Sequence, residues 1–202
     1  MAKLLLATNN PGKVFEYKSL FQGLPYEVVT LAEQGIATEV DEVGGNLEEN
    51  ARLKATALAA ETHLLTLADD SGLEVDALGG EPGPLSHRYA GEGASDADRV
   101  SYLLSRLKDV PWSERTARFR CVIALAMPGG NVEFCHGECP GIITLEPCGE
   151  QGFGYDPIFY LPELGKTMAE LSLDEKNRVS HRGMAAREAC QVLARLKNSI
   201  LK

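Results

Sequence analysis

Short apolar runs alternate with amphipathic helical stretches in the first part of the chain, and this alternation restricts the fold more than any other feature. The runs that we expect to form strands cover residues 3–7, 26–30 and 65–68. The helical stretches carry apolar stripes made of Val14, Tyr17 and Phe21 in the first and of Leu47, Ala51, Ala55 and Leu58 in the second. Strands that alternate with helices in this way predict an α/β arrangement.

The second part of the chain adds an antiparallel component. Residues 116–127 are the longest strand candidate, and the Pro-Gly-Gly-Asn turn at 128–131 leads into a second strand through Phe134, which predicts a hairpin. A helix opens at Ser95, and a last amphipathic helix is expected just after residues 180–183. The sequence therefore predicts an α/β (mixed α+β) fold with a mixed β-sheet.

Length and composition favour one domain. A chain of 202 residues with 44% hydrophobic residues buries a sizeable core, and it contains no internal repeat, so we expect a single domain spanning residues 1–202. The first apolar run is too short for a signal peptide, and no segment approaches the ~20 apolar residues of a membrane helix. We therefore expect a soluble, cytoplasmic protein with no membrane partner.

The cysteines and the charge balance exclude several kinds of site. The five cysteines are odd in number and lack the close pairs of a zinc ribbon, which favours reduced thiols. The net charge is -9, and no run of lysine and arginine offers a stripe for duplex nucleic acid, so we expect no nucleic-acid partner. A phosphate-bearing ligand must meet local positive groups, and we expect it to arrive with a metal ion.

The segment after the first strand has the parts of a phosphate-binding loop. Its polar groups come from Thr8, Asn9, Asn10 and Lys13 at the mouth of a helix, where free backbone N–H groups and the helix dipole attract anions. It is not a Walker loop, which ends in Gly-Lys-Ser or Gly-Lys-Thr after a longer spacing. The alternative is an ordinary strand-to-helix turn, because Asn, Pro and Gly are turn residues.

Two adjacent carboxylates, Asp69 and Asp70, follow the third apolar run, and we expect the strand to end there with a turn directly behind it. Mg²⁺ binds through one or two carboxylates together with waters and substrate phosphates, and a further carboxylate is available at Asp41 or Glu42. The alternative is that both acids are turn formers or caps. Two acids after an apolar strand are nevertheless costly unless they are hydrated, paired or metal-bound.

A lysine on the second helix is a further candidate for phosphate binding. Asn50 and Lys54 are four residues apart and therefore share a helix face. If that face lines the acidic site, Lys54 is available to a phosphate. The alternative is a lysine on the solvated side of an amphipathic helix.

Two later segments carry groups that suit a flat base. The Phe-Gly-Tyr-Asp segment at 153–156 combines ring surface with a carboxylate that accepts hydrogen bonds from a base edge. Lys176 and the Ser-His-Arg-Gly segment at 180–183 offer donors for the carbonyl oxygen of a 6-oxo purine. The alternatives are a tight turn with core aromatics and a helix start with an exposed arginine. No spacing suggests a Ser-His-Asp or Cys-His assembly, so covalent catalysis is poorly supported.

Five blocks of sequence, taken in order, point to a known family. They are Thr8-Asn9-Asn10-x-x-Lys13, Glu48-Glu49-Asn50-Ala51-x-x-Lys54-Ala55, Ala68-Asp69-Asp70-Ser71-Gly72-Leu73, Gly152-Phe153-Gly154-Tyr155-Asp156-Pro157 and Ser180-His181-Arg182-Gly183. Together they closely resemble the inosine/xanthosine triphosphate pyrophosphatase family, also called the Ham1-like family. The resemblance runs nearly end to end, over about 175 positions, which makes coincidence a poor explanation.

The resemblance implies a fold and an activity. The fold would be a long mixed β-sheet flanked by helices, with two lobes around a central substrate cleft, and the protein would be a homodimer. The activity would be Mg²⁺-dependent hydrolysis of purine nucleoside triphosphates such as ITP, dITP and XTP to the monophosphate and pyrophosphate, which removes non-standard purines from the precursor pool.

The resemblance also implies roles for individual residues. Asp70 would be the proton acceptor or metal-linked activator of water, with Asp69 beside it, and the metal ligands would be Asp70 and Glu42, with Asp41 a less favoured choice. The substrate-binding residues would be Thr8, Asn9, Asn10, Lys13, Lys54, Ser71, Phe153, Gly154, Tyr155, Asp156, Lys176, His181 and Arg182.

Two other functions are compatible with parts of the sequence. A Maf-like nucleotide pyrophosphatase would act on other modified nucleotides, but it would lack the blocks at 152–157 and 180–183. A non-catalytic nucleotide-binding regulator would use the same phosphate loop without needing Asp70. Two positions depart from the family pattern and bear on substrate preference, Asn9 where many members have Gly and His87 where a small residue is expected.

Overall fold

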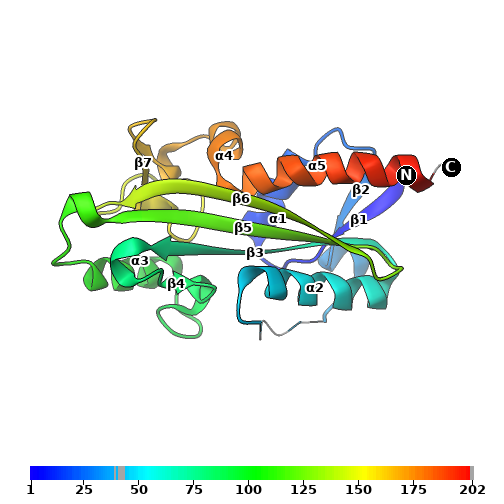
Figure 1. The fold of residues 1–202 in the computed structure, drawn as a ribbon, viewed down its shortest axis with the longest axis horizontal. Coiled ribbons are helices and arrows are strands. Elements are labelled where there is room, and N and C mark those ends of the chain that lie inside the picture. Colours follow the sequence, from blue (N-terminus) through cyan, green and yellow to red (C-terminus); the bar gives the residue numbers. More distant parts are fainter. Residues whose placement is uncertain (39, 41–43, 201–202) are drawn as a thin grey trace. The chain divides into compact units, whose positions relative to one another are not determined.

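The computed structural model describes residues 1–38, 40 and 44–200, with side chains as far as residue 197 (Figure 1). It divides into two compact units. The first consists of Met1–Asp70, Cys121–Gly137 and Arg182–Lys202, and the second of Ser71–Arg120 and Glu138–His181. Among the described residues, no helix is long and apolar enough to cross a membrane.

Parallel strands joined by helices form the start of the first unit. Strand β1 (Ala2–Leu6) pairs in parallel with both β2 (Tyr26–Thr30) and β3 (Leu65–Val75). Helix α1 (Pro11–Leu20) connects β1 to β2, and helix α2 (Leu47–Thr62) precedes β3. The alternation of strands and helices expected from the sequence is confirmed, because each crossover helix returns the chain in the direction that parallel pairing requires.

The expected hairpin completes the sheet of the first unit. The strand order of this sheet is β2-β1-β3-β5-β6, and a turn connects β5 (Thr116–Ala126) to β6 (Val132–Ile143). In register, Leu5 of β1 lies opposite Val29 of β2 and Thr66 of β3. Strands β3, β5 and β6 also contribute residues to the second unit. The chain therefore has a large mixed sheet flanked by helices, as expected.

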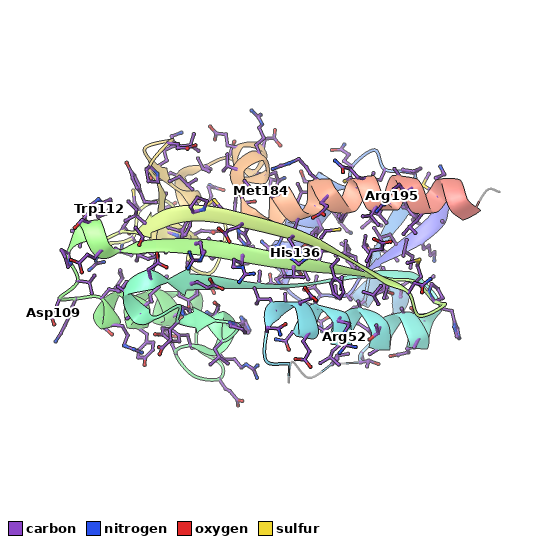
Figure 2. The ribbon with its side chains drawn as sticks, viewed as in Figure 1. Arg52, Asp109, Trp112, His136, Met184 and Arg195 are labelled. Carbon is purple, nitrogen blue, oxygen red and sulfur yellow. The ribbon has the colours of Figure 1, made fainter. Side chains whose placement is uncertain are left out.

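Each strand of the first unit directs alternate side chains into two separate hydrophobic cores. Leu4 packs against α1 and α5 (His181–Ile200), while Leu5 packs against α2 on the other face. The side chains of strand β5 alternate in the same way. Cys121, Ile123 and Leu125 lie on one face, and Val122, Ala124 and Ala126 lie on the other. Figure 1 shows α5 and α2 on opposite sides of these strands. Arg52 of α2 and Arg195 of α5, labelled in Figure 2, are exposed.

The second unit joins the remaining parts of β3, β5 and β6 to shorter elements. These elements are β4 (Pro82–Gly83), α3 (Asp96–Arg106), β7 (Phe159–Leu161), β8 (Lys166–Thr167) and α4 (Leu173–Val179). The strand order is β3-β5-β6-β7-β8, with β4 antiparallel to β3 and with β7 antiparallel to both β6 and β8. The 3₁₀ helices of the described chain cover Ala32–Gln34, Asp76–Leu78, Ser86–Arg88, Trp112–Glu114, Asp156–Ile158 and Met168–Glu170.

Strand β3 is longer than expected. The turn predicted directly behind the two carboxylates is wrong, because the strand continues from Asp69 to Val75. Leu73 and Val75 are fully buried and keep the alternation of the strand. Gly72 allows this course, since a Cβ there would lie only 2.3 Å from the carbonyl oxygen of Gly83 in the neighbouring β4. Both carboxylates therefore lie within a strand.

The C-terminal region also differs from expectation. Helix α5 begins at His181 rather than after Gly183, because Ser180 already ends the unexpected helix α4 and gives its N–H to the carbonyl of Lys176. The start of α4 is fixed by a capping box between Ser172 and Glu175. His181 and Arg182 are therefore helical residues.

Candidate active site

Asp69 and Asp70 point to opposite faces of β3, because successive side chains of a strand alternate. Asp69 is on the face of Leu67, which packs with α1 and α5, and Asp70 is on the face of Ala68, which packs with α2. The two residues are only 2% and 5% exposed. Asp69 and Asp70 are adjacent in sequence, but each therefore makes its own set of contacts.

On the α2 face, Asp70 is bound by Asn50. The Asn50 side-chain amide donates to Oδ2 of Asp70 over 2.9 Å, and its oxygen accepts from the backbone N–H of Gly44 over 2.8 Å. Lys54, one turn later, donates to the carbonyl oxygen of Asp69 over 2.8 Å, and its ammonium lies 4.0 Å from Oδ1 of Asp70. The prediction that Asn50 and Lys54 share a face is confirmed, and this face reaches the acidic pair.

On the other face, Asp69 is the centre of a buried ionic network. Lys13 of α1 lies 3.0 Å from Oδ2 of Asp69, and Arg182 of α5 lies 3.5 Å from the same oxygen. The Arg182 guanidinium also pairs with Glu16 over 2.8 Å. Burial by itself raises the pKa of Asp69, but the charges of Lys13 and Arg182 outweigh it and hold that pKa well below its usual value. Asp69 is therefore an ionised counter-ion for the partly buried Lys13 and the buried Arg182.

Two ammonium groups meet at one backbone oxygen. Lys13 reaches the carbonyl oxygen of Asp69 over 3.4 Å, and Lys54 reaches the same atom over 2.8 Å. Their side chains are 14% and 13% exposed, so each is largely buried. In a protein with a net charge of -9, this is a local concentration of positive charge beside a carboxylate.

The loop before α1 is held by its own side chains. Oδ1 of Asn10 accepts from the N–H of Lys13 over 3.1 Å, and the hydroxyl oxygen of Thr8 accepts from the N–H of Asn10 over 3.2 Å. Asn10 is thereby the N-cap of α1, with Pro11 at its first position. Asn9 is exposed. The structure thus brings the predicted phosphate-loop residues to the helix start from which Lys13 reaches Asp69.

The carboxylate Asp70 fits part of a magnesium site. Mg²⁺ takes hard oxygen ligands and uses one or two carboxylates together with waters and substrate phosphates. Asp70 supplies such an oxygen. Asp41 and Glu42, the other predicted ligands, lie outside the described residues. Within the part of the chain that the structure describes, no group of three or more His, Cys, Asp or Glu residues has the arrangement of a metal site.

The second unit brings three predicted base-binding residues together. The carboxylate of Asp156 accepts from the backbone N–H of Phe153 over 2.8 Å and forms a buried ion pair with Lys176. The Lys176 ammonium lies 4.9 Å from the centre of the Phe153 ring. A Cβ at Gly152 would lie 2.1 Å from Oδ2 of Asp156, so a larger residue here would force the carboxylate to shift. Lys176, 20 positions from Asp156 in sequence, thus contacts the 153–156 segment.

The remaining predicted residues occupy separate surroundings. Tyr155 is buried in the core of the second unit, and its hydroxyl donates to the carbonyl oxygen of Ser86 over 2.8 Å. His181 stacks on Phe119, with ring centres 4.6 Å apart. Arg182, the next residue, belongs to the network of Asp69 in the first unit. Ser71 is partly buried in β3. His181 and Arg182, although adjacent in sequence, therefore make different sets of contacts.

Three residues that contact predicted site residues were not themselves predicted to belong to the site. Asn50 was noted for sharing a face with Lys54, and its position between the apolar Leu47 and Ala51 of α2 is a signal of a polar residue on a buried face. Glu16 follows Lys13 by one helical turn, which is a weaker signal. Asp96 binds the backbone N–H of Gly154, and it is indistinguishable in sequence from an ordinary acidic residue at a helix start.

Two known enzymes are similar to this chain over nearly its whole length. The dITP/XTP pyrophosphatase of Desulforamulus reducens is 52% identical over 194 residues, which cover 96% of each chain. The dITP/XTP pyrophosphatase of Bacillus subtilis is 47% identical over 193 residues, which cover 96% of this chain and 98% of that protein.

Solved structures and a family model agree with these similarities. A HAM1 protein from Coxiella burnetii is 42% identical with a TM-score of 0.87, covering 96% of this chain and all of that one. The Staphylococcus aureus Ham1 protein is 42% identical with a TM-score of 0.84, covering 98% and 99% of the two chains. The model of the Ham1 family matches residues 4–192. This protein therefore belongs to the Ham1 family.

Proposed function

We propose that this protein is a Mg²⁺-dependent nucleoside-triphosphate pyrophosphatase that hydrolyses non-standard purine nucleotides, ITP, dITP and XTP, to the monophosphate and pyrophosphate. The observation that carries the proposal is the nearly buried carboxylate of Asp70, which Asn50 binds and which lies 4.0 Å from the Lys54 ammonium. Lys54 and Lys13 both bind the neighbouring carbonyl oxygen of Asp69. The names of the relatives at 52% and 47% identity support the choice of substrate.

The triphosphate would be bound by the first unit. Lys13 and Lys54 carry charges that complement the β- and γ-phosphates, and the helix start formed by Thr8, Asn9 and Asn10 offers polar groups and a favourable dipole. A phosphate oxygen that displaced the Asp69 carbonyl from either ammonium would exchange a neutral acceptor for a charged one. Such bonds are about twice as strong as neutral ones.

Asp70 would act as the proton acceptor. A water oxygen forms a bond to the α-phosphorus, its proton passes to Asp70, and the bond from the α-phosphorus to the bridging oxygen of the β-phosphate breaks, which releases pyrophosphate. Asn50 donates to Oδ2 of Asp70 and would thereby orient the carboxylate toward the attacking water oxygen. The protein's remaining task is to hold the phosphates in line with that oxygen.

The metal would be held by Asp70 and Glu42, with Asp41 as the alternative to Glu42. Family membership implies a divalent cation, and the oxygen donors of these side chains favour Mg²⁺. When bound, the ion would neutralise phosphate charge and lower the pKa of a bound water. Gly44, two residues after Glu42 in sequence, donates its N–H to Asn50, the residue that binds Asp70.

Asp69 would have a different role from Asp70. Its side chain is fully buried on the opposite face of the strand and is committed to Lys13 and Arg182. We therefore assign it to positioning Lys13 rather than to proton transfer. Arg182, which joins Asp69 to Glu16, would act through the same network rather than by direct contact with a base.

The base would be bound by the second unit. Phe153 offers ring surface, and Lys176, held by Asp156, offers a donor to a 6-oxo group. Gly154 contributes backbone, Tyr155 anchors the segment to Ser86, and His181 is fixed by its stacking on Phe119. Ser71 would contact the substrate beside Asp70. Adenine lacks the 6-oxo group and would be rejected by these donors.

The organisation of the protein completes the proposal. The family model spans both compact units, which supports one catalytic domain covering residues 1–202. We propose a homodimer that works in the cytoplasm, where nucleotide precursors are used, and this location suits the five unbonded thiols of the chain. Sedimentation of the purified protein tests the dimer.

A pyrophosphate-release assay with Mg²⁺ tests the function directly. It compares ITP, dITP, XTP, GTP, ATP and dTTP, and we expect strong release from the first three. Preference for dTTP would favour the Maf-like alternative, and binding without turnover would favour the regulator. Asp70→Asn should reduce turnover by about 10²–10⁴-fold while leaving substrate affinity within a factor of about ten. Full activity in that variant would remove Asp70 from the reaction.

A further inference from the structure

The segment 149–156, which carries the proposed base-binding residues, has little regular structure of its own. Gly149, Gly152 and Gly154 have φ angles of 86°, 77° and 63°. Glycine reaches such conformations easily but loses much conformational freedom when it is fixed in one of them. The shape of this segment therefore depends on contacts that other parts of the second unit provide.

Asp96, the first residue of α3, provides one of these contacts. Its Oδ2 accepts a hydrogen bond from the backbone N–H of Gly154 over 2.7 Å, across 58 positions of sequence. Its Oδ1 forms an ion pair with Arg99 one helical turn later. Because the acceptor is a carboxylate, the bond to Gly154 belongs to the stronger, charge-assisted class.

The surroundings of Asp96 keep its carboxylate ionised. Burial by itself raises the pKa of Asp96, but the hydrogen bond from Gly154 and the charge of Arg99 outweigh it and lower that pKa. The start of α3 adds a favourable dipole for a negative charge. The acceptor that Gly154 requires is therefore present at neutral pH.

Arg99 connects α3 to a second segment, which contains Ser86 and His87. It is 8% exposed, and its guanidinium donates to the carbonyl oxygen of His87 over 3.1 Å. The neighbouring Ser86 accepts from the hydroxyl of Tyr155 over 2.8 Å. Gly154 therefore binds α3 directly, through Asp96. Tyr155 binds Ser86, and the next residue, His87, is bound by Arg99 of α3.

We infer that Asp96 is a positioning residue for base selection, which holds the Gly154 backbone so that Phe153 and Asp156 keep the arrangement that discriminates among purines. This inference rests on the proposed function. Asp96 acts on the base-binding segment, whereas the phosphates and the water are assigned to residues of the first unit. Its loss should therefore weaken base recognition without slowing the chemical step.

Asp96→Ala and Asp98→Ala form a matched pair for the test. Both remove a carboxylate from the first turn of α3, but Asp98 binds Ser95 in the capping box instead of Gly154. For Asp96→Ala we expect the KM for ITP and the inhibition constant of inosine monophosphate to rise about tenfold, with kcat within about twofold. Inhibition by inorganic tripolyphosphate, which has no base, should be unchanged. Asp98→Ala should alter none of these quantities beyond its effect on Tm.

The outcomes separate the inference from the function. Equal effects of the two variants, or equal weakening of inosine monophosphate and tripolyphosphate by Asp96→Ala, would overturn the inference and leave the function standing. A wild-type protein that neither hydrolyses ITP nor binds inosine monophosphate would overturn both. If Asp96→Ala does not fold, Asp96→Asn keeps an oxygen for Gly154 but loses the charge, and it should weaken inosine monophosphate about threefold. Unchanged binding in Asp96→Asn would then overturn the inference.

Discussion

The amide of Asn50 donates a hydrogen bond to Oδ2 of Asp70 over 2.9 Å, while the Gly44 N–H occupies the oxygen of the same amide over 2.8 Å. An amide oxygen accepts and its NH₂ group donates, so the Gly44 bond determines which end of Asn50 faces the carboxylate. Asn50 is 2% exposed, and it therefore holds its orientation within a packed interior. The orientation of Asp70 thus depends on a residue 20 positions away.

Replacing Asn50 should affect turnover more than binding. In Asn50→Ala, Asp70 loses the hydrogen bond from this amide and the Gly44 N–H loses the amide oxygen, so we expect kcat to fall by at least about tenfold. The KM for ITP should change less, because Lys13 and Lys54 are untouched. Arg52→Ala, an exposed change on the same helix, is the control. An Asn50→Ala enzyme with wild-type kcat would show that Asp70 needs no such partner.

Removing the charge of Asp69 should destabilise the protein. Asp69→Asn removes the buried counter-ion that Lys13 and Arg182 share, although Arg182 keeps its pair with Glu16, and breaking a buried pair in this way costs about 3–5 kcal/mol. Urea unfolding followed by circular dichroism measures the loss. If stability is preserved but hydrolysis is abolished, Asp69 belongs to the chemistry rather than to the positioning of Lys13.

The two lysines at the Asp69 carbonyl should act together on phosphate. Lys13→Met and Lys54→Met should each weaken inhibition by tripolyphosphate by about tenfold or more, since each removes a charge-assisted bond. The double variant should depart from the sum of the two effects, because residues that share a partner are coupled. Lys18→Met is the control, since Lys18 is on α1 but pairs with Glu33 at the surface. Tripolyphosphate inhibition that is unaffected in both single variants would contradict this assignment.

An acidic residue of the second unit should give a pH-dependent contribution to stability. Burial by itself raises the pKa of Glu74, but hydrogen bonds from Arg118 and Arg120 outweigh it and lower that pKa. Since the folded pKa is depressed, the contribution is present above the unfolded pKa of about 4.3 and is lost as pH falls through the folded pKa.

Glu74→Gln measures this contribution. At pH 7 it should lower the free energy of unfolding by at most about 1 kcal/mol, because the group is near the surface. The difference from wild type should shrink as the pH falls below about 4.3. It should also shrink in 1 M salt, where charges are screened beyond about 3 Å. A difference that is independent of pH would mean that packing, not charge, is responsible.

The sequence predicted the elements that depend on local chemistry. The start of α3 at Ser95 was readable because a cap and the residue that it binds are three positions apart. Strand β2 and the hairpin of β5 and β6 followed from apolar runs and a glycine turn. The start of α5 was missed because Ser180 ends one helix just before the next begins, and the short α4 has no strong apolar period.

The sequence by itself determined the family and the mixed sheet, because motifs and apolar periods are properties of neighbouring positions. Only the tertiary structure decided which contacts Asp69 and Asp70 each make. Locally, two acids after an apolar run indicate a turn, since an ionised carboxylate is costly to bury. The strand continues because Lys13, Asn50 and Arg182 arrive from three helices and supply the charges and hydrogen bonds that make burial possible.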